Sequence, residues 1–97
     1  MKPTRAYILQ RLQQSKPAID ACGVRRLGLF GSAVRDEATD TSDLDFVVDF
    51  ERKSFDGYMD LKFLLEDLFG RRVDLVISDA IKPRLRPAIL SEAVYVP

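Results

Sequence analysis

Apolar and polar side chains alternate from residue 43 to residue 50, with Val47 as the one apolar residue at a polar position. The first set is Leu44, Phe46, Val48 and Phe50, and the second is Asp43, Asp45, Val47 and Asp49. Successive side chains of a β-strand point to opposite faces of the sheet, so this period of two predicts a strand. One face of the strand is apolar and the other is acidic, which is typical of a half-buried strand.

Two further segments predict strands, residues 24–30 and residues 72–77. In the later one, Val73, Leu75 and Ile77 share one face and Arg72, Asp74 and Val76 the other. Asp74 is therefore expected opposite the apolar face, as are Asp43 and Asp45. Gly31-Ser32 ends the earlier strand and opens a short helix through Arg35.

Amphipathic patterns predict helices between these strands. One helix is capped by Thr4 and runs to about Gln14, and a shorter one follows and stops at Gly23. A third lies between a Ser54 cap and Gly70. Its apolar stripe, widened by two phenylalanines, consists of Tyr58, Leu61, Leu65, Leu68, Phe63 and Phe69.

The order of these elements predicts an α/β (α+β) sandwich, in which helices flank a small mixed sheet of about three strands. Residues 78–97 are expected to add one or two short helices and an extended end. With 97 residues, of which 46% are hydrophobic, the chain fits one domain over 1–97.

Composition limits the classes of function. Fifteen basic and fifteen acidic residues cancel, so no global positive field gathers nucleic acid, and no direct nucleic-acid partner is expected. The chain has no histidine, so carboxylates must carry any metal chemistry. A single cysteine and the lack of a signal-peptide or membrane-spanning pattern favour the cytoplasm and no membrane partner.

Three aspartates form a candidate metal site. Strand residues two apart lie about 6.5 Å apart on one face, so Asp43 and Asp45 can converge on a pair of cations. Asp74, on the equivalent face of a neighbouring strand, would complete an oxygen-rich cluster that suits Mg²⁺. The alternative, which we favour for Asp49, is an acid on a solvated strand face.

Gly31-Ser32 is a candidate phosphate seat twelve residues before Asp43. Glycine lets the backbone approach a phosphate, and the following helix offers unpaired N–H groups. A tight turn with a helix cap is the alternative. A Gly-Ser pair that is followed, after ten residues, by Asp-x-Asp should occur by chance in about one in a thousand chains of this length.

Gly31-Ser32, the Asp43-Leu44-Asp45 motif and the later Val73-Asp74-Leu75 strand resemble the signature of the DNA polymerase beta-type nucleotidyltransferase superfamily. Within it, the chain resembles the minimal nucleotidyltransferase antitoxins that pair with HEPN-domain toxins. The resemblance implies a nucleotidyltransferase fold.

By this resemblance, Gly31 and Ser32 hold the triphosphate of ATP, and Asp43 and Asp45 bind two Mg²⁺ ions. Asp74 helps to bind the catalytic metal and to activate the incoming hydroxyl. Arg35 either contacts phosphate or pairs with a nearby acid, and Ser42 either hydrogen-bonds within its loop or touches nucleotide.

The sequence departs from the superfamily pattern at one position. The family usually follows Gly-Ser with a small residue and Arg-Gly-Glu. This chain has Ala33-Val34-Arg35-Asp36-Glu37, in which Asp36 occupies the glycine position. This change can alter the loop over the nucleotide, but it touches no metal ligand. A short basic run follows later in the chain and consists of Lys82, Arg84 and Arg86. These side chains could reach the triphosphate or an acidic partner, or they could simply be solvated.

The function that the resemblance implies is that of an antitoxin in a type VII-like toxin–antitoxin system. It would transfer AMP from ATP to a tyrosine of its HEPN ribonuclease toxin, in a hetero-oligomer, and silence the toxin. One alternative is a non-catalytic antitoxin that acts by occlusion. Another is a small-molecule nucleotidyltransferase acting on an antibiotic such as an aminoglycoside, for which we expect the chain to be too short.

Overall fold

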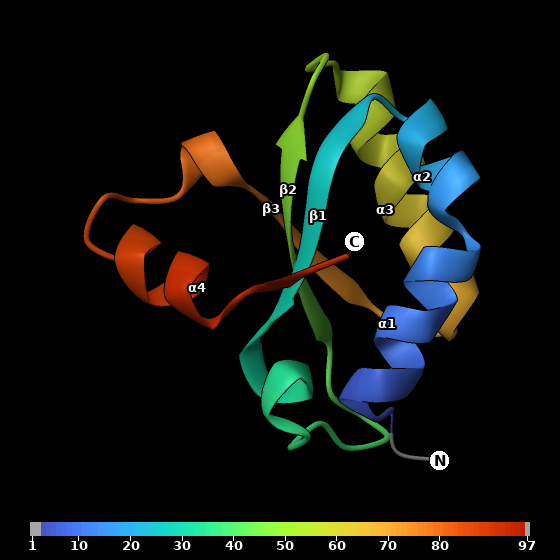
Figure 1. Ribbon diagram of the computed structural model, residues 1–97, viewed down its shortest axis with the longest axis vertical. Helices are drawn as coiled ribbons and strands as arrows, with labels where there is room; N and C mark the ends of the chain where they lie inside the picture. The colour runs from blue at the N-terminus through green and yellow to red at the C-terminus, as the bar shows by residue number, and fades with distance from the viewer. Residues whose placement is uncertain (1–2, 97) are drawn as a thin grey trace.

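The computed structural model describes residues 3–96, which form a sheet with helices on both sides (Figure 1). Three helices, α1 (Arg5–Gln14), α2 (Lys16–Ala21) and α3 (Phe55–Phe69), cover one face of the sheet. On the opposite side lie the 3₁₀ helix η2 (Ser78–Ala80) and α4 (Arg86–Glu92). No helix within residues 3–96 has the length and apolar character needed to cross a membrane.

The sheet is mixed and has the order β3-β2-β1-β4 within the described residues. Strand β1 (Val24–Phe30) pairs antiparallel with β2 (Leu44–Phe50), and β2 pairs parallel with β3 (Val73–Ile77). The predicted fold class is confirmed, but the expected count of about three strands missed β4 (Val94–Tyr95), which pairs with β1. Two residues are too few to show an alternating pattern, so only pairing with β1 reveals this strand.

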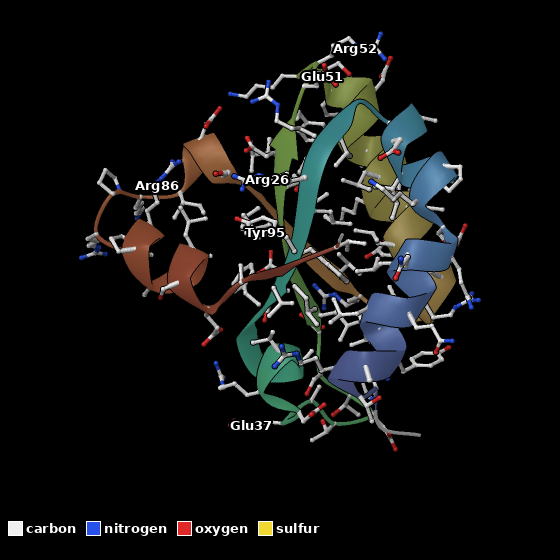
Figure 2. The ribbon with its side chains drawn as sticks, viewed as in Figure 1. Arg26, Glu37, Glu51, Arg52, Arg86 and Tyr95 are labelled. Atoms are coloured by element: carbon white, nitrogen blue, oxygen red, sulfur yellow. The ribbon has the colours of Figure 1, made fainter. Side chains whose placement is uncertain are left out.

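Tyr95 attaches β4 to the sheet. It lies opposite Gly28 of β1, where an added Cβ would come within 3.1 Å of the Tyr95 ring. Arg26, also on β1, stacks its guanidinium 4.6 Å from the centroid of the same ring (Figure 2). The Val96 amide donates to the Leu27 carbonyl at 2.9 Å. Glycine at position 28 therefore leaves room for the aromatic ring that closes this edge.

Capping residues confirm the predicted ends of the helices. Thr4 Oγ1 accepts a hydrogen bond from the Tyr7 amide at 3.1 Å, and Ser54 Oγ accepts one from the Gly57 amide at 2.9 Å. Gly70 ends α3 in the left-handed conformation, with φ +62°. The hydroxyl groups of Thr4 and Ser54 satisfy N–H groups that have no partner within the helix.

The apolar face of β2 lies under α1 and α3 and forms the centre of the core. Its residues are almost or completely buried: Leu44, Phe46, Val48 and Phe50. The predicted stripe of α3 is correct at Leu61 and Leu65, which are fully buried, but wrong at Phe63, which is 55% exposed. In a helix, Phe63 lies about 200° around the axis from Leu61, so it points away from the sheet.

The other face of β2 is less uniformly polar than the alternation predicts. Val47 is completely buried and Asp45 is half-buried, because η1 (Gly31–Arg35) and α4 lie over this face. Arg86 stabilises the turn before α4 by donating to the Ser78 carbonyl at 2.8 Å. Of the three residues in the basic run, Arg86 is therefore a structural one.

Candidate active site

The junction between β1 and η1 brings the Gly31 backbone against Asp45. Phe30, the last residue of β1, pairs with Asp45 of β2, so the chain turns into η1 directly over that carboxylate. Gly31 has φ +76°, and a Cβ built there would collide with the Asp45 side chain, whose Cγ would lie only 3.0 Å away. Both the backbone conformation and the close approach require glycine at this position.

Asp74 lies beside Asp45 in the sheet. The two are directly paired in the parallel register of β3 and β2, so their side chains project from the same face. Asp43 precedes the first residue of β2 and is exposed, as is Asp74. The alternation predicts that Asp43 is part of the strand, but the pairing of β2 begins one residue later, at Leu44.

The acids near Asp45 alter its ionisation. Burial raises the pKa of Asp45 above its ordinary value, and the negative charges of Asp74 and Asp43 raise it further. Arg35 acts in the opposite direction with a smaller effect. A half-buried carboxylate that other carboxylates repel favours a bound cation, which would relieve both penalties.

A complete metal centre is not already assembled. Among residues 3–96, no three histidine, cysteine or acidic side chains gather closely enough to hold one ion. The interactions of Asp45 with Asp43 and Asp74 bring the acids into one electrostatic neighbourhood. Their convergence as ligands stays a prediction, one that requires the side chains to rotate towards a cation.

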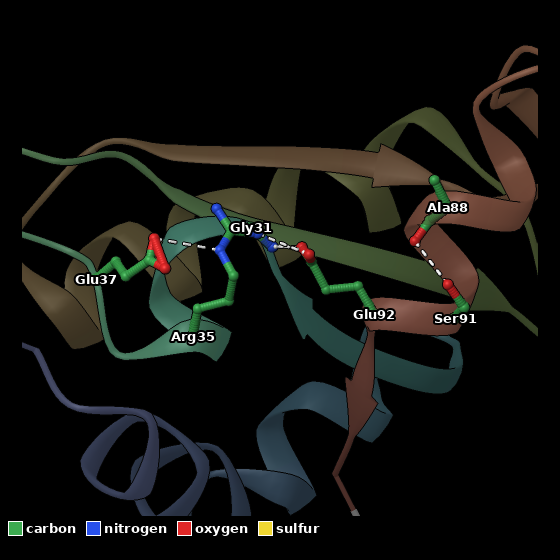
Figure 3. Close-up of polar contacts among 6 residues, drawn as sticks. All are labelled: Gly31, Arg35, Glu37, Ala88, Ser91 and Glu92. Carbon is green, nitrogen blue, oxygen red and sulfur yellow. Dashed lines mark hydrogen bonds and ion pairs between the residues drawn. The ribbon is translucent and has the colours of Figure 1, made fainter.

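Glu92 is an acid in this site that no sequence pattern predicted. The Gly31 amide donates to Glu92 Oε1 at 2.6 Å, and Arg35 Nη1 donates to Glu92 Oε2 at 2.7 Å (Figure 3). Glu92 is the last residue of α4 and follows Gly31 by 61 positions. No local pattern marks it, because only the return of the chain across the sheet brings it to η1.

Arg35 pairs with acids in the structure, which matches one of its two predicted roles. Besides Glu92, it contacts Glu37 through Nε at 3.4 Å. These hydrogen bonds, the one to Glu92 most of all, raise the pKa of Arg35 above its ordinary value. Its guanidinium therefore stays positively charged beside the Gly31 amide, the condition for attracting an anion.

Ser32 and Ser42 differ in position. Ser32 is half-buried in η1 next to Gly31, and its carbonyl accepts from the Glu37 amide at 2.8 Å. Ser42 Oγ accepts from the Thr39 amide at 2.9 Å. Ser42 therefore hydrogen-bonds within its loop, whereas Ser32 lies on the phosphate seat that the sequence predicts.

Asp36 adopts the backbone conformation that suits glycine. It ends η1 with φ +57°, and its Oδ1 accepts from the Arg5 amide at 2.7 Å. Aspartate visits this left-handed region more readily than most residues. The loop thus retains its turn, and the carboxylate lies at the N-terminus of α1, where the helix dipole favours a negative charge.

An apolar groove of about 450 Å³ lies beside the acidic face, between β3 and α4. Leu75, Val76, Ile77 and Ile89 contribute to its lining, so it adjoins Asp74 along β3. Tyr58 of α3 closes one side and donates its hydroxyl to the Leu75 carbonyl at 2.7 Å. Lys82 of the basic run also lines this groove, whereas the residues predicted to bind metal or phosphate do not.

Comparison with known protein families identifies one model, that of the nucleotidyltransferase domain, which matches residues 6–96. The protein adenylyltransferase MntA of Thermococcus cleftensis is 47% identical over 75 residues, 76% of each chain. A candidate protein adenylyltransferase of Methanocaldococcus jannaschii is 44% identical over 75 residues, 76% of this chain and 81% of the relative.

Solved structures agree with the family match. A candidate minimal nucleotidyltransferase superimposes with a TM-score of 0.74 at 38% identity, covering 89% of this chain and 93% of the other. A chain from a mutant toxin–antitoxin MntA structure gives a TM-score of 0.64 at 17% identity. The superposition covers 97% of this chain and 72% of the other, and it shows a shared fold.

Proposed function

Because this chain belongs to the nucleotidyltransferase domain family, we propose that it transfers AMP from ATP to a hydroxyl of a partner protein, a toxin that it neutralises as an antitoxin. The observation that carries the proposal is the juxtaposition of three groups. The Gly31 backbone lies against Asp45, and Asp74 lies beside Asp45. The relatives named as protein adenylyltransferases support a protein as the acceptor.

The donor set fits magnesium. Asp43, Asp45 and Asp74 offer only oxygen ligands, and a divalent cation would relieve the burial penalty and the repulsion that together raise the pKa of Asp45. We assign to these three aspartates the binding of two Mg²⁺ ions. When bound, the ions would neutralise charge on the phosphates and lower the pKa of the acceptor hydroxyl.

The transfer requires one bond to form and one to break. The acceptor oxygen bonds to the α-phosphorus of ATP, the bond from that phosphorus to the bridging oxygen breaks, and pyrophosphate leaves. The hydroxyl proton passes to the Asp74 carboxylate. The N–H groups around Gly31 and Ser32, with Arg35, hold the phosphates and stabilise the charge that develops on them.

We propose a HEPN-domain toxin as the acceptor protein, modified on a tyrosine within a hetero-oligomer in the cytoplasm. The MntA relative and the fold shared with a toxin–antitoxin structure support this partner class. The exposed face of Asp74 and the groove next to it leave access for a protein side chain.

The proposal is tested by co-expressing the chain with the toxin and measuring the intact mass of the toxin. The wild type should add the mass of one or more AMP units. Asp43→Asn and Asp45→Asn should leave the toxin unmodified. Asp49→Asn is the matched control, because Asp49 lies on the same strand but pairs with Arg26 at 3.1 Å, away from Gly31.

Two results would replace this function with another. If the wild type and Asp45→Asn neutralise the toxin equally and the mass of the toxin does not change, the chain is an antitoxin that acts by occlusion. Labelled AMP appearing on an aminoglycoside, and not on the toxin, would indicate a small-molecule nucleotidyltransferase.

A further inference from the structure

The Glu92 carboxylate occupies the phosphate seat described above. One of its oxygens accepts from the Gly31 amide at 2.6 Å and the other from Arg35 at 2.7 Å. Figure 3 shows the side chain reaching from the end of α4 to both donors. The protein therefore places its own anion on two groups to which we assign triphosphate binding.

A phosphate oxygen and a carboxylate oxygen compete for the same donors. Both form short, charge-assisted hydrogen bonds to backbone amides and to guanidinium groups. The Gly31 amide supplies a single hydrogen, which Glu92 already uses. A triphosphate that takes this hydrogen must displace Glu92, and one that binds beside Glu92 meets a like charge.

The position of Glu92 means that little free energy is needed to displace its side chain. The side chain of Glu92 is 32% exposed and that of Arg35 is 46% exposed, so solvent weakens their ion pair. No residue of α4 is fully buried, so Glu92 can turn away without opening the core. The contact is thus strong enough to compete with a ligand and weak enough to yield to one.

We infer that Glu92 is an internal competitor of the nucleotide, which lowers the affinity of the phosphate seat for ATP until the triphosphate displaces it. This inference rests on the proposed function for the identity of the ligand. Glu92 then acts on binding and not on the chemical step, so its removal should alter KM for ATP much more than kcat.

The test measures the affinity of the purified chain for two probes, MgATP and inorganic tripolyphosphate, by calorimetry and by the NMR shift of the Gly31 amide. Glu92→Gln removes the charge and keeps the shape, and Glu92→Ala removes the competitor altogether. Both should bind each probe about threefold to tenfold more tightly than the wild type, as expected for the loss of one partly exposed charged contact.

Two control variants separate this effect from a general loss of negative charge. Glu37→Gln removes the other acid that contacts Arg35 but leaves the Gly31 amide engaged, so it should have the smaller effect. Glu51→Gln, an exposed acid at the opposite end of β2 (Figure 2), should leave both affinities unchanged. Thermal unfolding of each variant checks that it folds.

The outcomes distinguish this inference from the proposed function. Tighter tripolyphosphate binding by folded Glu92→Gln supports the inference even if no AMP transfer is found. Unchanged or weaker binding of both probes by that variant would overturn it, even if AMP transfer to the toxin proceeds. If Glu92→Ala fails to fold, Glu92→Gln alone decides.

Discussion

At the scale of single residues, Gly31 combines a positive φ with a collision that an added Cβ would meet, whereas Gly70 has the positive φ alone. Its positive φ resembles that of Gly70, but Gly70 has no atom within 4 Å of an added Cβ, whereas Gly31 faces the Asp45 side chain. Comparing alanine substitutions at Gly31 and Gly70 therefore separates the energy of backbone strain from the energy of a steric clash.

Gly31→Ala should destabilise the fold by about 2–3 kcal/mol, and Gly70→Ala by about 1 kcal/mol, the cost of a positive φ alone. Urea denaturation measures both free energies of unfolding. Gly31→Ala should also reduce AMP transfer at least about a hundredfold, because the Asp45 carboxylate must move. Equal losses of stability in the two variants would contradict the proposed clash.

Asp45 illustrates a conflict between stability and function. Burial and the neighbouring acids raise its pKa, which means that its negative charge opposes folding in the metal-free protein. Asp45→Asn removes that charge at nearly constant volume. We expect the metal-free variant to be as stable as the wild type or more stable, while AMP transfer falls by a factor of about 10² or more. Chemical denaturation in the presence of a chelator would disprove this if the variant were clearly less stable.

At the scale of elements, β4 couples the position of α4 to the sheet. Glu92 and β4 are separated by one residue, so the pairing of Val94 and Tyr95 with β1 holds the end of α4 near η1. Gly28 permits this pairing by leaving space for the Tyr95 ring.

Gly28→Ala should loosen β4, because its Cβ would lie 3.1 Å from the Tyr95 ring and 3.2 Å from Val47 Cγ1. We expect a loss of about 1–2 kcal/mol in stability. The Val96 amide, which donates to the Leu27 carbonyl, should exchange its hydrogen faster. Hydrogen exchange followed by NMR measures this, with the Leu44 amide on the far side of β2 as the internal reference. Unchanged protection at Val96 would show that the ring accommodates the methyl group.

At the scale of the whole molecule, ligand binding should be visible as stability. A ligand that binds only the folded chain stabilises it by about 2.7 kcal/mol at one hundred times its Kd. For a chain of 97 residues this corresponds to a rise in Tm of roughly 10 °C or more. MgATP should produce that rise in the wild type but not in Asp45→Asn, as measured by calorimetry. A rise of the same size in both proteins would show that ATP binds elsewhere.

Much of the architecture follows from short stretches of sequence. The alternation at 43–50, the caps at Thr4 and Ser54 and the stop at Gly70 predict elements whose bounds agree with the structure to within about one residue. Each depends on residues no more than about four positions apart, because helical and strand periodicities are local. The likeness of the Gly-Ser and Asp-x-Asp motifs to a known family also required only their spacing.

Tertiary structure decided the remaining features. Strand β4 exists only because β1 offers an edge for pairing, and Val47 is buried only because other elements cover the acidic face. Glu92 reaches Gly31 across 61 positions of sequence. Such contacts depend on how the folded layers return the chain to one place, and no local pattern encodes the resulting distance. The sequence therefore determined which elements form and which motifs they carry, and packing determined which charges meet.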